Sequence, residues 1–451
     1  MKDILVSLRK YFLRDIHLKE LFKGSSIAFA FKIFSILLSY VFFYVLAKMF
    51  GAVGLGIFNT CFTVLILTTV IAKLGLDTAL VKYIAEYVAK DNKHDIGRLY
   101  FISFFLIVFT GIIIGVLIFV FAAKLSILFF ENESQGELFK IIGFSIVPFS
   151  ITQLNSEYYR GLKRITAHSS LQNGTVYFII LVIVLVLSRY YQNVDIVIYS
   201  LLFTSLFLML LSTFFIFKKI YSFQSRYGHA EESKSRISKR QLISVSIPML
   251  FSNSLFLVMN WTDTLMLSAF HGEDTVGIYN IALKIASLNT IALIAINSIA
   301  SPKFSEIYSS EGKRRLRRIV QQTTILSWLV SFPVFVVILI FPESILNIFG
   351  QEFVIGKNAL IILSIGQIIS AFSGSTMIVL NMTGREKAGR NILLVTVVLN
   401  ILINYILIPR YGIIGAAIAT MFSTVFWNIG SVIFIYKSFG FLTFPLNRKK
   451  I

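Results

Sequence analysis

The segment GIFN, residues Gly56–Asn59, returns 221 positions later as GIYN, residues Gly277–Asn280. The same offset brings SRY (Ser188–Tyr190) onto PRY (Pro409–Tyr411), and eight of the 36 residues at positions 53–88 are identical to their partners. Matches in the same order over this length indicate that the second half of the chain repeats the first. We therefore expect two halves with the same fold.

The composition indicates that both halves lie in a membrane. The chain has 451 residues, of which 56% are hydrophobic and 14% charged, with 44 phenylalanines. Soluble domains have about 45–50% apolar and about 25% charged residues. Apolar stretches of roughly 20 residues, enough to cross a bilayer, recur along the whole chain. We predict an all-α polytopic membrane protein. The one cysteine, Cys61, cannot form an intramolecular disulfide and is expected to be a packing residue.

Twelve membrane spans are predicted, and they fall into two lobes of six around a central cavity. The spans are approximately 24–47, 53–78, 99–123, 138–159, 168–188, 195–217, 241–269, 275–300, 319–341, 358–380, 391–408 and 412–436. The predicted parts are an interfacial amphipathic segment (1–23), an N-lobe (24–219), a cytoplasmic linker (220–240), a C-lobe (241–438) and a cytoplasmic tail (439–451). Because six is even, both lobes have the same orientation and form a parallel repeat.

The basic residues predict the orientation. With a cytoplasmic N-terminus, 33 of the 42 Lys and Arg lie in cytoplasmic segments, six outside and three within spans. This asymmetry follows the positive-inside rule and places both termini in the cytoplasm of a multi-pass cell-membrane protein. The net charge of +20 is thereby explained by membrane topology and contact with anionic lipids, and no nucleic-acid partner is expected.

Polar side chains recur on one helical face of four spans. They are Lys32 in the first span; Asn59, Lys73 and Asp77 in the second; Asn253 and Asn260 in the seventh; and Asn280 and Lys284 in the eighth. Ionisable groups within spans nearly always face a bundle interior or an aqueous cavity, because exposure to lipid is costly. We therefore predict that the lysines and asparagines of this set bind the substrate.

Two acids are predicted to balance these cations. Asp263, in the stretch LFLVMNWTDTLMLSAF (Leu255–Phe270), is expected to be the counter-charge of Lys284 or a site for a coupling ion. Asp77 lies one turn after Lys73 and can pair with it. A structural role for Lys73, in that pair or reaching the cytoplasmic surface, is as well supported as a role in the cavity.

Other chemistry has little support in the sequence. No phosphate loop ending in GK[ST] occurs, and the five histidines lack metal-ligand spacing. No catalytic triad or pair of carboxylates can be argued. We therefore expect no enzyme activity, no metal and no cofactor, apart from coupling to H⁺, Na⁺ or the membrane potential.

Several motifs resemble a known family. GAVGLGIFN followed by LGLDTALVKYIAEY (Leu74–Tyr87) is similar to the first repeat of the polysaccharide (O-antigen type) flippases, in the multidrug/oligosaccharidyl-lipid/polysaccharide exporter superfamily. WTDTLMLSAFHGEDTVGIYNIALKIA (Trp261–Ala286) and LIPRYGIIGAAIAT (Leu407–Thr420) resemble their second repeat. The resemblance implies two six-helix lobes that form a V-shaped cavity. It also implies that the protein moves a lipid-linked oligosaccharide from the inner to the outer leaflet. We expect a monomer that works beside other polysaccharide-assembly membrane proteins.

Competing functions remain at this point. A cation-coupled multidrug exporter of the same superfamily would favour net acidic groups in its cavity, whereas this set of polar residues is net basic. A polytopic glycan polymerase or glycosyltransferase would need a large external loop with a catalytic acid or base, and the predicted external loops are short. A channel or scaffold is a third alternative.

Overall fold

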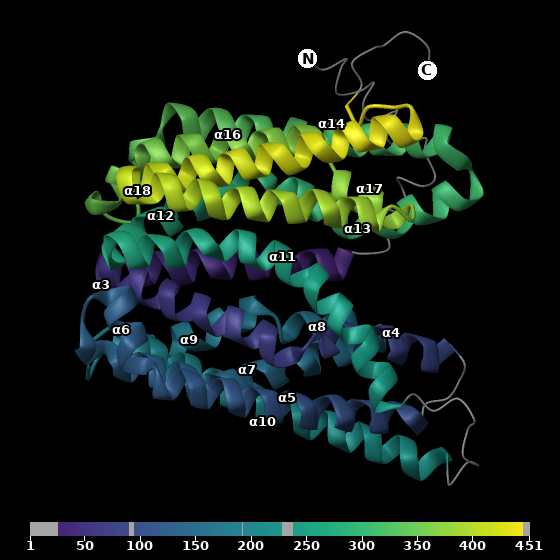
Figure 1. Ribbon diagram of the computed structural model, residues 1–451, viewed down its shortest axis with the longest axis horizontal. Coiled ribbons are helices and arrows are strands. Elements are labelled where there is room, and N and C mark those ends of the chain that lie inside the picture. The colour runs from purple at the N-terminus through teal and green to yellow at the C-terminus, as the bar shows by residue number, and fades with distance from the viewer. Residues whose placement is uncertain (1–25, 90–93, 192, 228–237, 445–451) are drawn as a thin grey trace. The chain divides into compact units, whose positions relative to one another are not determined.

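The computed structural model describes residues 26–89, 94–191, 193–227 and 238–444, and these residues form helices and turns without any strand. The helices are α3 (Ser26–Lys73), α4 (Leu76–Ala89), α5 (His94–Val120), α6 (Ala122–Phe130), η1 (Glu133–Gln135), α7 (Gly136–Gly161), α8 (Ile165–Ser170), α9 (Asn173–Leu187), α10 (Asp195–Tyr227), α11 (Lys239–His271), α12 (Glu273–Ala286), η2 (Ser287–Thr290), α13 (Ile291–Ser310), α14 (Gly312–Ile340), α15 (Pro342–Asn347), η3 (Gln351–Gly356), α16 (Lys357–Ser373), α17 (Thr376–Met382) and α18 (Glu386–Phe439) (Figure 1). The predicted interfacial segment 1–23, residues 228–237 of the linker and residues 445–451 of the tail lie outside the described residues.

The described helices account for twelve spans. Ten elements are long and apolar enough to cross a membrane when the bent helix α11 is taken as one span. Two of them, α3 and α18, each join two helices across a break, at Gly51 and Gly412. A straight helix of 54 residues, the length of α18, would be about 80 Å long, far beyond a hydrocarbon layer of about 30 Å. The ten elements thus hold twelve spans, and the predicted fold class is confirmed.

The repeat extends to the backbone of its turns. Gly51 has φ 65° between the two helices of α3, and Gly272 has φ 83° between α11 and α12. These glycines are separated by the repeat offset of 221 residues. Positive φ is unfavourable for residues with a Cβ, and glycine adopts it freely. Each half therefore ends its first span with the same kind of turn.

Two compact units can be described. Among the described residues, the first unit comprises those from 31 to 280, and the second comprises those from 281 to 444 together with residues 26–30. In the first unit, α11 and the beginning of α12 pack with the helices that precede them. The division into lobes at the linker 220–240 stays a prediction.

Polar networks join the helices within each unit. In the first unit, the Tyr100 hydroxyl donates to Asn155 Oδ1 at 2.6 Å, and Asn155 Nδ2 donates to Ser212 Oγ at 2.7 Å. These contacts connect α5, α7 and α10. In the second unit, Asn400 Nδ2 donates to Ser423 Oγ at 3.1 Å across the two helices of α18, which lie side by side in Figure 1. Buried polar groups that find such partners hold helices in register.

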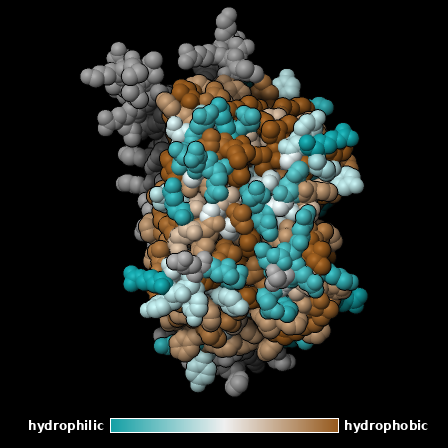
Figure 2. All heavy atoms as spheres, turned by 90° about the vertical axis from the view of Figure 1, so that its left-hand side faces the viewer, coloured by the Kyte–Doolittle hydropathy of each residue, from teal (hydrophilic) through white to brown (hydrophobic). Residues whose placement is uncertain are grey.

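The outer surface of the helices is apolar. Phe105, Phe109, Val116 and Val120 of α5 have exposed fractions of 66%, 65%, 55% and 67%. Side chains of this size gathered on one helix are unfavourable in water and suit a lipid environment. Figure 2, which looks onto helix ends, shows hydrophilic side chains among the hydrophobic ones. The protein is a multi-pass membrane protein.

Candidate functional site

The repeat motifs touch each other within the first unit. A Cβ added to Gly56 would lie 1.7 Å from the carbonyl oxygen of Glu273, and one added to Gly277 would lie 2.0 Å from that of Ala52. Glu273 and Gly277 are the repeat partners of Ala52 and Gly56. The second helix of α3 and the beginning of α12 therefore cross through two equivalent contacts, in which the glycine of each repeat meets the same backbone carbonyl of the other. This reciprocity is expected of two repeats related by a common axis.

The paired asparagines of the motif also behave alike. Asn59 Nδ2 donates to the carbonyl of Leu55 at 2.8 Å, and Asn280 Nδ2 donates to that of Val276 at 3.0 Å. Leu55 and Val276 are again repeat partners. Asn280 Nδ2 additionally lies 3.3 Å from Thr264 Oγ1 of α11. Both predicted site residues therefore lie in corresponding positions, where their own helices satisfy part of their hydrogen bonding.

Asp263 is buried and bonded to a tyrosine. Its exposed fraction is 1%, and its Oδ2 accepts a hydrogen bond of 2.6 Å from the hydroxyl of Tyr279, which is fully buried. The bond joins α11 to α12. A phenol O–H donates to a carboxylate in a short, strong hydrogen bond. Part of the reason why the segment tolerates a carboxylate is therefore this donor, which the sequence analysis missed.

The first half of the repeat has an apolar contact at the same place. Subtracting 221 from Asp263 and Tyr279 gives Phe42 and Phe58. Their rings are 5.2 Å apart, edge to face, and both side chains are fully buried. The two halves thus share the contact but differ in its chemistry. The replacement of Phe58 by tyrosine in GIYN was the available sequence signal.

The other predicted residues are placed as follows. Asn260 is exposed on α11, and its Nδ2 donates to the carbonyl of Phe256 at 2.6 Å. Lys284 lies in the last turn of α12 and is half-buried, in the second unit. Lys32 and Asn253 lie on α3 and α11, and their side chains are outside the described part of the chain. The pairing of Asp263 with Lys284 stays a prediction.

Lys73 and Asp77 form the expected pair. Lys73 Nζ lies 2.7 Å from Asp77 Oδ2 and donates to Gln153 Oε1 of α7 at 2.5 Å. The pair spans the break between α3 and α4, where Leu74 and Gly75 both have positive φ. Lys73 is therefore engaged within its own unit, and Gln153 is a partner that helical periodicity could not reveal.

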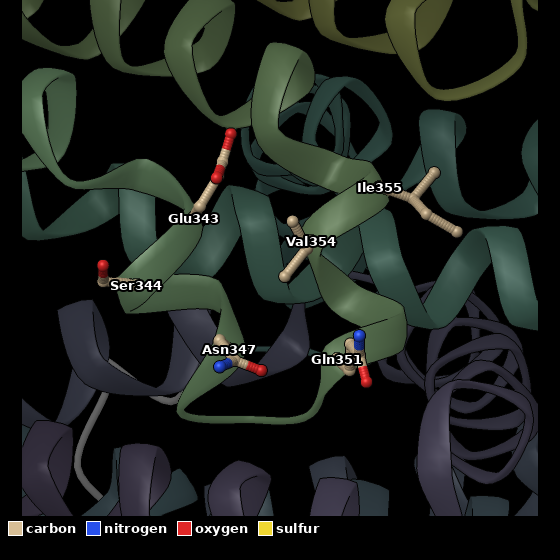
Figure 3. Close-up of a pocket in the computed structure, with 6 residues that line it drawn as sticks. All are labelled: Glu343, Ser344, Asn347, Gln351, Val354 and Ile355. Atoms are coloured by element: carbon tan, nitrogen blue, oxygen red, sulfur yellow. The ribbon is translucent and has the colours of Figure 1, made fainter.

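A shallow polar hollow lies in the second unit, between α15 and η3. It has a volume of about 770 Å³ and is lined by Glu343, Ser344, Asn347, Gln351, Val354 and Ile355 (Figure 3). An ion pair of 2.7 Å between Glu343 and Lys357 joins its edge to α16. The segment 342–357 belongs to a loop predicted to face outward. None of the predicted site residues lines the hollow.

The described residues contain no group of three or more His, Cys, Asp or Glu that could hold a metal ion. Cys61 is buried and free, as expected for a packing residue. The candidate site residues thus comprise a buried ion pair (Lys73 with Asp77), side-chain amides (Asn59 and Asn280) and a carboxylate bonded to a phenol (Asp263 with Tyr279). Such groups can bind and release an ion or a polar ligand.

Comparisons with known proteins agree with these features. A family model described as polysaccharide biosynthesis protein matches residues 21–308, and one described as MatE matches residues 248–406. An uncharacterised membrane protein of Methanocaldococcus jannaschii is 25% identical over 403 residues, covering 85% of this chain and 77% of that one. A probable low-salt glycan biosynthesis flippase of Haloferax volcanii is 31% identical over 168 residues, covering 36% and 35% of the two chains.

Solved structures show the fold. A lipid II flippase in an inward closed conformation superposes with a TM-score of 0.70 at 16% identity, covering 91% of this chain and 87% of that one. An inward-facing multidrug resistance MATE family transporter of the MOP superfamily gives a TM-score of 0.71 at 14% identity, covering 90% and 94%. The chain therefore has the twelve-helix, two-lobe fold of these transporters.

Proposed function

The chain belongs to the polysaccharide biosynthesis protein family, and from this membership we propose that it is a flippase for an oligosaccharide linked to a polyprenyl (pyro)phosphate. In this proposal the substrate moves from the inner to the outer leaflet by alternating access, for the synthesis of a surface polysaccharide. The flippases among the relatives support the proposal. Several relatives are named as flippases or as a transporter, which argues against an enzyme.

The observation that carries the substrate class is the sign of the charge on the polar faces. A pyrophosphate headgroup cannot cross hydrocarbon without counter-charges, because its desolvation is prohibitive. Lys284 supplies a half-buried ammonium in the segment 273–297, which is long and apolar enough to cross a membrane, and Lys32 lies on α3 within the predicted first span. Ammonium–phosphate hydrogen bonds are among the strongest in proteins. We propose that these two lysines bind the phosphates and that Asn59, Asn260, Asn253 and Asn280 bind polar groups of the glycan.

A deletion strain tests this proposal directly. Mass spectrometry of its lipid extract should find a lipid-linked oligosaccharide that accumulates and returns to its normal level when the gene is restored. Restoration with Lys284→Gln should leave the accumulation in place, although the variant is present in the membrane at the normal level. A lipid extract without any accumulating glycan lipid would contradict the proposed substrate.

One specific observation favours a second candidate, a cation-coupled multidrug exporter. The MatE model matches residues 248–406, and a probable multidrug resistance protein of Oceanobacillus iheyensis is 27% identical over 221 residues. The buried carboxylate of Asp263 also suits a coupling ion, H⁺ or Na⁺. If this candidate is correct, the deletion strain should become sensitive to cationic dyes and accumulate no glycan lipid.

A further inference from the structure

Glu157 is a carboxylate that lies inside the end of a membrane span. It lies on α7, four residues before that helix ends at Gly161, which is about 6 Å along the axis. Its side chain is 15% exposed, and it lies on the same face as Gln153, one turn earlier. A buried carboxylate is costly unless cations compensate it or it takes up a proton. The groups around Glu157 decide between these outcomes.

The charged groups that act on Glu157 come from four elements. Arg160 Nε lies 3.0 Å from its Oε2, but the Arg160 side chain is 46% exposed and reaches solvent. His168 Nδ1 of α8 lies 3.9 Å from its Oε1. Lys73 and Asp77, at the ends of α3 and α4, are the other charges whose fields reach it. When the His168 imidazole is neutral, the positive charges of Arg160 and Lys73 are balanced by the carboxylates of Glu157 and Asp77.

The imidazole of His168 is held in one orientation. The Ser156 hydroxyl donates to the backbone carbonyl of His168 at 3.0 Å and accepts from Gln172 Nε2 at 3.0 Å. His168 Nδ1 lies 3.1 Å from the carbonyl of Ser156, which can only accept. Nδ1 also lies 2.9 Å from the Ser156 hydroxyl oxygen, so Ser156 holds the ring at Nδ1 whichever ring nitrogen carries the hydrogen. The ring is thus fixed beside Glu157 by its neighbours.

The cluster is connected to the first helix of the second repeat. Lys73 lies between Asp77 and Gln153, and Gly75 follows in the same break. A Cβ added to Gly75 would lie 2.2 Å from the carbonyl oxygen of Ser246 in α11. A change of charge at Glu157 alters the field at Lys73. The charge of Glu157 therefore influences the break between α3 and α4 at the place where Gly75 contacts α11.

We propose that Glu157, with His168 beside it, is a proton-binding site. A proton from water at this end of the span forms one O–H bond on the Glu157 carboxylate and raises the charge of the cluster by one. Arg160 then loses a negative partner, and Lys73 loses the field of a negative charge. The binding of the proton stands on the contacts above, and its use in transport rests on the proposed function.

The same helix provides a matched control. Glu137 and Lys140 have the spacing of Glu157 and Arg160, and their ion pair is 2.6 Å long, but the Glu137 side chain is 69% exposed. Such a pair is a solvated surface ion pair. Glu137→Gln therefore removes a carboxylate from α7 without affecting the proposed site.

Infrared difference spectra of the full chain in lipid nanodiscs test the proposal. They are recorded between about pH 8 and about pH 5, a range that includes the titration of an ordinary histidine. In the wild type, acidification should produce the C=O band of a protonated, shielded carboxylic acid, shifted in D₂O. Glu157→Gln should lose this band and Glu137→Gln should keep it. His168→Gln should keep the band but move the pH at which half of it has formed.

Each result decides the matter. If Glu157→Gln does not fold, Glu157→Asp retains a carboxyl whose band should appear at a changed frequency. Spectra of Glu157→Gln that coincide with those of the wild type, or a loss equal to that in Glu137→Gln, would overturn the proposal. No substrate is present, so this failure would leave the proposed flippase activity standing. A failure of the glycan-lipid test would likewise leave the proton site standing.

Discussion

The Tyr279 hydroxyl donates a 2.6 Å hydrogen bond to the Asp263 carboxylate where the first half of the repeat places Phe42 against Phe58. Both members of each pair are buried. A buried carboxylate costs desolvation energy that two packed rings do not. Packing alone therefore does not explain the polar pair. Its presence in one half only marks this position as a candidate for a role in transport.

Removing the hydroxyl should destabilise the protein. Tyr279→Phe leaves Asp263 without this donor, and the loss of a buried partner costs about 1–3 kcal/mol. Thermal unfolding in detergent should show a lower midpoint. The double variant Asp263→Phe with Tyr279→Phe copies the first half and should regain stability while transport falls. An unchanged midpoint in Tyr279→Phe would show that the bond contributes nothing.

The reciprocal glycine contact should tolerate no side chain. A Cβ at Gly56 or Gly277 would lie 1.7 or 2.0 Å from a carbonyl oxygen of the facing repeat. Because backbone cannot move as a flexible side chain does, Gly56→Ala and Gly277→Ala should each reduce the yield of folded protein severalfold. Gly430→Ala, which meets only an Ile392 side-chain carbon at 3.3 Å, is the control. Size-exclusion chromatography measures the yield, and equal yields for all three variants would contradict the close crossing.

The fold could be predicted from the sequence because its signals are local or periodic. Apolar stretches long enough to span a bilayer indicated twelve spans, and the repeat located the motifs that meet at Gly56 and Gly277. The pair of Lys73 with Asp77 was within reach because the two lie one turn apart.

The partners contributed by other helices could not be predicted in this way. Gln153 of α7 meets Lys73 at the end of α3, and His168 of α8 meets Glu157 of α7, only because these helices pack together. Tyr279 corresponds to Phe58 in the first half, so a comparison that counts only identical residues does not detect it. Spacing along one helix does not specify which neighbouring helix supplies a donor.

Breaking the pair of Lys73 with Asp77 should cost more than breaking a surface pair. Their side chains are 10% and 15% exposed, and removing one partner of a buried pair leaves an uncompensated charge. Asp77→Asn should therefore lower the free energy of unfolding by about 3 kcal/mol. Lys140→Gln, which breaks the exposed pair with Glu137, should cost less than about 1 kcal/mol. Denaturation in mild detergent measures both, and similar small losses would mean that the Lys73 pair is effectively solvated.

The orientation can be tested with single cysteines in a Cys61→Ala background. The positive-inside rule predicts that Ser310, before the basic run 313–318, faces the cytoplasm and that Gly272 faces outward. An impermeant thiol reagent on intact cells should label a cysteine at Gly272 and leave one at Ser310 unlabelled until the cells are opened. The opposite pattern would reverse the topology and the proposed direction of transport.

The predicted coupling of Asp263 to Lys284 is tested by a double-mutant cycle. Lys284→Gln removes a proposed phosphate ligand, so flipping should be lost while folded protein remains. Asp263→Asn keeps the shape of the side chain but removes its charge. If Asp263 balances Lys284, transport should fall about tenfold or more while substrate binding is unchanged or tighter, because the ammonium would hold the phosphate without a competing carboxylate. The double variant should then lose less than the sum of the single losses, expressed as free energies. Losses that add within about 0.5 kcal/mol would show that the two residues act independently. The hydrogen bond from Tyr279 would then remain the observed contact that stabilises a carboxylate in this helix.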